Sequence, residues 1–74
     1  MTQYPSLTGT QVLTAPTRLG FEVVRTKGSH HYVKHADGRG TAVPVHSGET
    51  IGRGLMAKIL RDLDLTREEL HTAL

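Results

Sequence analysis

The order of apolar positions divides the chain into a helix, a block of short strands and a second helix. Near the N-terminus apolar residues recur at roughly helical spacing, and after residue 20 aromatic and β-branched residues that favour strands replace them. Helical spacing returns in the last third and predicts an apolar helix face packed on the strands. The members of that face are Ile51, Leu55, Ile59, Leu60 and Leu63.

The first helix is predicted to begin near Gly9, because Thr8 and Gln11 have the spacing of a capping box. Pro16 falls in its second half. An interior proline removes a backbone donor and clashes with the preceding turn, at a cost of about 3 kcal/mol. We therefore expect this helix to be kinked or shortened near Ala15.

Three strands are predicted between the helices. A tight turn at Lys27 and Gly28 joins the first to the second, and the Asp37-Gly38 pair is a strong hairpin signal before the third. Pro44 suggests that the third strand lies at a sheet edge. The expected strands are 21–26, about 29–35 and about 41–45.

The chain ends with another capping box, Thr66 with Glu69, which predicts a short last helix that docks through Leu70 and Leu74. The expected fold is α+β: helix, three-stranded antiparallel sheet, helix and short C-terminal helix, in a single domain over 1–74. Both main helices should pack on one face of the sheet, which leaves the other face free to meet a partner.

Size and composition narrow the function classes. A domain of 74 residues buries only about 60% of its unfolded surface, so its stability is marginal and a stabilising partner is plausible. There is no cysteine, which excludes disulfides and thiolate zinc sites. No signal-peptide pattern and no long apolar run is present, so we expect a cytoplasmic protein without a membrane partner. The net charge is only +2, so charge placement must decide between partners.

Five histidines are a high share for this composition. His31 and His35 would lie on one strand face, but four residues along a strand separate side chains by roughly 13 Å, too far for direct chelation by the pair. No zinc-type spacing is present, and we expect neither a metal nor another cofactor. Taken individually, His31, His35, His46 and His71 are interpreted as surface residues without a particular function.

His30 has a stronger case for chemistry. It directly follows a glycine turn and alternates with Tyr32 and Lys34, so one strand face carries a proton carrier, a stacking ring and a cation. RNA suits such a face because its own 2′-hydroxyl can be the nucleophile, and the protein needs only to move protons and stabilise charge. Arg25 and Lys27 are near enough in sequence to pair with phosphates.

A specific set of motifs resembles a known family. The set comprises Gly20-Phe21 before the first strand, Gly28-Ser29-His30, the turn from His35 to Gly38, Val43-Pro44, and Leu55 with Ile59-Leu60. Over about 6–66 the chain resembles the HicA (YcfA-like) toxins of bacterial toxin–antitoxin systems. The resemblance implies a fold like a double-stranded RNA-binding domain, metal-independent cleavage of mRNA, and inhibition by a HicB-like antitoxin.

The resemblance also assigns roles to residues. It places the catalytic histidine on His30, with His31 a weaker candidate because it lies on the opposite strand face. The antitoxin is expected to cover the His30 face, and DNA to be contacted only through the antitoxin. The residues expected to bind RNA are Lys27, Gly28, Ser29, Tyr32, Lys34, Lys58 and Arg61.

Two departures and two rival functions remain at this point. Pro16 interrupts a helix that the family usually continues, and Gly52 stands where a proline is common before the second helix.

One rival function is that of a noncatalytic RNA-binding module whose phosphate contacts come from the second helix. The other is that of a degenerate toxin within a repressor complex. The second proton carrier stays open among His31, Lys27 and water. The helix cations of the first rival are Arg53, Lys58 and Arg61.

Overall fold

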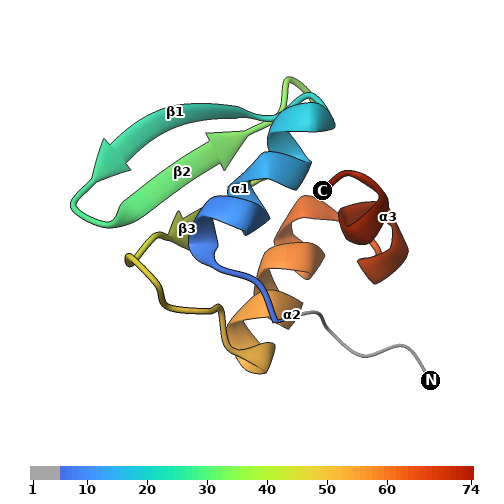
Figure 1. Cartoon of the computed structure of the whole chain (residues 1–74). Helices are drawn as coiled ribbons and strands as arrows, with labels where there is room; N and C mark the ends of the chain where they lie inside the picture. The colour runs from blue at the N-terminus through green and yellow to red at the C-terminus, as the bar shows by residue number, and fades with distance from the viewer. Residues whose placement is uncertain (1–5) are drawn as a thin grey trace.

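The structure is a computed structural model that describes residues 6–74. It confirms the expected α+β order, with strand limits within about one residue of those predicted (Figure 1). The elements are α1 (Gly9–Arg18), β1 (Glu22–Lys27), β2 (His30–Lys34), β3 (Gly40–Pro44), α2 (Arg53–Leu63) and α3 (Arg67–Thr72).

The sheet is an antiparallel meander in the order β1-β2-β3, so β3 is an edge strand, as Pro44 suggested. Both α1 and α2 pack against β3, and α1 also contacts β1. Val33 and Val43 point toward these helices and are buried, whereas every residue of β1 is exposed. The hairpin of β1 and β2 therefore projects beyond the helices (Figure 1).

One core lies between the sheet and the helices. The α2 face differs from the predicted one: Met56 is fully buried, whereas Leu55 is 36% exposed. Ile59, Leu60 and Leu63 are buried as predicted, and Ile51 contributes to the core from the loop before the helix, which begins at Arg53. The buried hydrophobic residues are Leu7, Val12, Ala15, Phe21, Val33, Val43, Met56, Ile59, Leu60, Leu63, Leu70 and Ala73.

Pro16 does not shorten α1, which continues to Arg18, so the expected end near Ala15 is wrong. The proline removes one donor, the N–H that would bond the Val12 carbonyl, and its ring is buried in the core. Its carbonyl oxygen accepts hydrogen bonds from the N–H groups of Leu19 (3.0 Å) and Phe21 (2.9 Å), which close the helix end. Burial and capping together offset the missing donor.

The start of α1 packs directly against the end of β3. Thr8 and Gln11 form the predicted capping box, with the Thr8 N–H donating to Gln11 Oε1 at 2.9 Å. Gly9 is buried against the backbone of Pro44 and Val45, and a Cβ at Gly9 would overlap the Pro44 carbonyl oxygen. Only glycine permits this approach.

The C-terminal helix also begins at its predicted capping box, in which the Glu69 N–H donates to Thr66 Oγ1 at 3.0 Å. Leu70 is buried, as expected. Leu74, however, is 36% exposed, and Ala73 takes the second buried position because the helix ends at residue 72. No helix within 6–74 is long and apolar enough to cross a membrane.

Candidate functional site

A two-residue turn of Gly28 and Ser29 joins β1 to β2 and presents His30 at the start of β2. Lys27 pairs with His30 across the turn. Gly28 has φ 58°, whereas Ser29 is not left-handed, the combination that a type II′ turn requires and that favours glycine first. The turn thus lies one residue later than predicted, and His30 and Lys27 are both exposed beside it.

The side chains that the sequence placed on one strand face lie on the outer face of the sheet. His30, Tyr32 and Lys34 alternate with the buried Val33, which points to the helices. Arg25 lies opposite Tyr32 in the register, and its guanidinium carbon is 5.8 Å from the centre of the tyrosine ring. This face therefore combines an imidazole, an aromatic ring and cations.

Arg25 reaches that face because β1 is irregular. The register shifts between Val23 and Arg25, so Val23 pairs with the core-facing Val33 and Arg25 pairs with the outward Tyr32. Without this bulge, Val23 and Arg25 would point to the same side.

Lys58 lies near the same side chains. A shallow hollow is lined by residues of all three strands and of α2, including Arg25, Tyr32, Lys34 and Lys58. Lys58 Nζ is 2.7 Å from Asp62 Oδ2, so this cation is already paired. Arg61 is exposed on α2 but does not line the hollow, and neither does His30.

Two further histidines contact the Gly28-Ser29 turn at Ser29. His46 Nε2 is 3.5 Å from Ser29 Oγ, and His31 Nδ1 is 3.2 Å from the Ser29 carbonyl oxygen. Because a carbonyl only accepts, the His31 contact requires the tautomer with hydrogen on Nδ1. The Val45 N–H donates to the same oxygen at 2.7 Å. Sequence reasoning interpreted His46 as a surface residue and did not place it beside this turn, although the register that puts Pro44 opposite His30 brings it there.

His35 has a structural environment instead. Its ring packs edge-on against Phe21 at 5.0 Å, and its Nδ1 accepts from the Asp37 N–H at 3.1 Å. Arg39 stacks 5.0 Å from the centre of the Phe21 ring and donates to the Leu63 carbonyl at 2.8 Å, which ties the β2–β3 turn to the end of α2. The Arg39 backbone N–H lowers the pKa of Asp37.

Within residues 6–74 no three metal-ligating side chains form a cluster.

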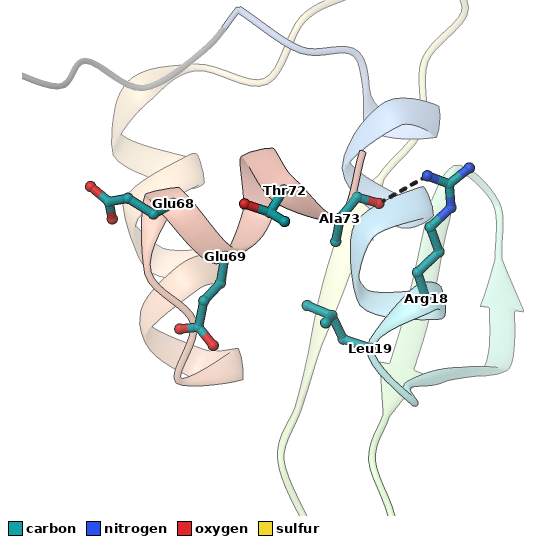
Figure 2. Close-up of a pocket in the computed structure, with 6 residues that line it drawn as sticks. All are labelled: Arg18, Leu19, Glu68, Glu69, Thr72 and Ala73. Carbon is teal, nitrogen blue, oxygen red and sulfur yellow. Dashed lines mark hydrogen bonds between the residues drawn. The ribbon is translucent and has the colours of Figure 1, made fainter.

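Another hollow lies at the junction of α1 and α3, away from all predicted site residues (Figure 2). Its lining is mostly apolar around Leu19, and Arg18 Nη1 donates to the carbonyl oxygens of Ala73 (3.3 Å) and Leu74 (2.7 Å). These bonds fasten the last residues to α1.

The fold and this face define a small α+β protein with an open sheet face that carries a histidine, an aromatic ring and cations. The chain matches the family model of the HicA toxin of bacterial toxin–antitoxin systems over residues 9–65, and it therefore belongs to the HicA toxin family. It is a toxin of a toxin–antitoxin system. Members of the HicA toxin family are generally ribonucleases and have an antitoxin partner. A search of curated proteins found no match.

Proposed function

We propose that this toxin is a metal-independent endoribonuclease that cleaves mRNA, with His30 as a general acid or base. The RNA 2′-oxygen attacks the adjacent phosphorus, the bond from phosphorus to the 5′-oxygen breaks, and a cyclic phosphate remains. The observation that carries this proposal is the exposed position of His30, beside Lys27 and on the same open face as Tyr32 and Lys34, in a HicA family chain.

The neighbours of His30 suit RNA. The cations of Lys27 and Lys34 bind phosphate oxygens, and the Tyr32 ring stacks on an unpaired base. Gly28 and Ser29 let the RNA backbone approach the turn closely, because a glycine carries no side chain. Lys58 and Arg61 extend phosphate contact along α2, although Lys58 first has to share its charge with Asp62.

The same face explains inhibition. We propose that a HicB-like antitoxin covers the outer sheet face in the cytoplasm, buries His30 and blocks RNA entry, and that DNA is contacted only through the antitoxin. The toxin unit is taken as one domain over 1–74. Cleavage that persists in a saturated toxin–antitoxin complex would contradict this arrangement.

The test is RNA cleavage by purified protein in EDTA, comparing wild type with His30→Ala. His30 is exposed and packs little, so we expect circular dichroism to stay unchanged while the rate falls by about 100-fold or more. His71→Ala, at an exposed histidine on α3, is the matched control and should cleave like wild type. Cleavage by His30→Ala at the wild-type rate would exclude the proposed role.

The noncatalytic alternative makes a different prediction in the same assay. A binding module would retard RNA in a gel without shortening it, and removal of charge at Arg53, Lys58 or Arg61 would weaken retardation more than His30→Ala would. All three cations are exposed on α2, which is the observation in favour of this alternative.

A further inference from the structure

Cleavage by the 2′-hydroxyl needs two proton transfers. A base accepts the proton of the 2′-hydroxyl as the bond from oxygen to phosphorus forms, and an acid delivers a proton to the departing 5′-oxygen. His30 supplies one of these transfers under the proposed function. The other needs a second group near the same turn whose pKa lies near neutrality.

The structure brings His46 to that turn from a distant part of the sequence. His46 Nε2 lies 3.5 Å from Ser29 Oγ, and Ser29 directly precedes His30. The bond from the Val45 N–H to the Ser29 carbonyl (2.7 Å) holds the segment before His46 against the turn. Pro44, two residues earlier, pairs with His30 in the register of β2 and β3.

Exposure favours His46 over the other nearby groups. The rings of His46 and His30 are both exposed and reachable by RNA, whereas His31 is half-buried, lies on the core-facing side of β2 and directs Nδ1 to a backbone carbonyl. Lys27 is exposed, but an ordinary lysine has a pKa of about 10.4 and is a weak acid at neutral pH. An ordinary histidine, with a pKa of about 6.5, carries protons in either direction there.

We propose that His46 is the second proton carrier and that it shares the two transfers with His30 beside the Gly28-Ser29 turn. One imidazole accepts the proton of the 2′-hydroxyl, and the other donates a proton to the 5′-oxygen. No oxidant, metal or further reactant enters the step. This inference rests on the proposed function and adds a second catalytic residue to it.

The first test compares His46→Gln with His30→Gln in the full chain. A glutamine amide can replace Nε2 as a hydrogen-bond partner of Ser29 Oγ, but it cannot carry a proton at neutral pH. We expect His46→Gln to lose about 100-fold or more in rate, as His30→Gln does, with unchanged circular dichroism. His71→Gln is the matched control. Activity of His46→Gln within about threefold of wild type would leave only a positioning role and overturn the proposal.

The second test separates proton transfer from structural damage. A short RNA is made around the bond that wild type cleaves, with sulfur in place of the departing 5′-oxygen. A thiol has a pKa of about 8.5, so the sulfur leaves without being protonated. We expect this substrate to restore the rate of one of the two glutamine variants and not the other. Restoration of both, or of neither, would contradict the shared assignment.

A second variant guards against loss of folding. If His46→Gln is unfolded, His46→Ala is assayed with added imidazole. Imidazole should raise the cleavage rate of His46→Ala but not that of His71→Ala. If imidazole does not raise the rate of folded His46→Ala, the proposal is overturned. Failure of wild type to cleave RNA removes the proposed function and this inference together. Cleavage by wild type and by His46→Gln, but not by His30→Gln, removes only the role of His46.

Discussion

Asp62 links two elements of the molecule through one carboxylate. Its Oδ2 accepts from Lys58 Nζ at 2.7 Å and from Thr41 Oγ1 at 2.9 Å, which joins α2 to β3 beside the shallow hollow. The hydrogen bond from Lys58 is the main cause that lowers the pKa of Asp62 below 3.8, and the Thr41 hydroxyl adds to it. The native state therefore prefers the charged carboxylate.

This preference makes stability depend on pH. A carboxyl whose folded pKa lies below its unfolded value stabilises the native state above the unfolded pKa, and this contribution is lost as pH falls through the folded pKa. We expect Asp62→Asn to lower the free energy of unfolding at pH 7, and the difference from wild type to shrink in acid below 3.8. Urea denaturation of wild type and Asp62→Asn at pH 7 and in acid measures this difference in the free energy of unfolding.

Glu49→Gln, at an exposed loop carboxylate, is the charge-matched control and should show no comparable dependence. An Asp62→Asn effect of equal size at both pH values would indicate lost packing rather than a lost charge interaction.

Sequence alternation located part of the site because β2 is regular. A period of two places His30, Tyr32 and Lys34 on one face without knowledge of any neighbour. Arg25 and His46 could not be found in this way. Arg25 reaches the face only through a bulge in β1, and His46 lies beyond β3, where its position depends on the pairing register.

At the scale of elements, two helical glycines occupy opposite environments. Gly9 begins α1 against the backbone of β3, where an added Cβ would lie 2.9 Å from the Val45 Cα and overlap the Pro44 oxygen. Gly54 lies in the first turn of α2, where a Cβ would meet nothing within 4 Å. The same substitution should therefore have opposite effects at the two positions.

Gly54→Ala is expected to raise the free energy of unfolding by about 0.5–1 kcal/mol, because alanine loses less entropy than glycine in a helix. Gly9→Ala should lower it by about 1–3 kcal/mol, since backbone atoms must move to admit the methyl group. Urea denaturation of both variants checks the signs. Equal stabilisation at both positions would show that α1 does not press on β3 as described.

The sequence predicted where the helices begin better than it predicted which of their faces are buried. Both capping boxes depend on side chains three residues apart, which the sequence displays directly. The buried face of α2 instead depends on tertiary packing: Met56 lies three and four residues before the buried Ile59 and Leu60, whereas Leu55 lies at the edge of that face. Pro16 was misread because its burial in the core is a tertiary property.

At the scale of the whole molecule, a single small core supports an open sheet face. The order of elements followed from the sequence because each change of apolar period coincides with a boundary. The projection of the β1–β2 hairpin beyond the helices did not, since it depends on how helices and strands pack. A domain of this size has little stability in reserve.

Binding of the antitoxin should therefore be visible as stabilisation. A partner that binds only the folded toxin adds about 2.7 kcal/mol when its free concentration is 100 times Kd. We expect a higher melting temperature for the toxin with its cognate antitoxin and, in parallel, suppressed RNA cleavage. Stabilisation without suppression would place the antitoxin on another face than that of His30.

The contact of Gly9 with β3 has a consequence for genetics. The Val45 N–H donates to the Ser29 carbonyl oxygen, and the Val45 backbone is packed on Gly9, so the turn that carries His30 is supported by Gly9. In a selection for cells that survive expression of this toxin, escape mutations should arise at codon 9 as well as at codon 30. A toxin with alanine at codon 54 should stay active, so cells that express it should not survive.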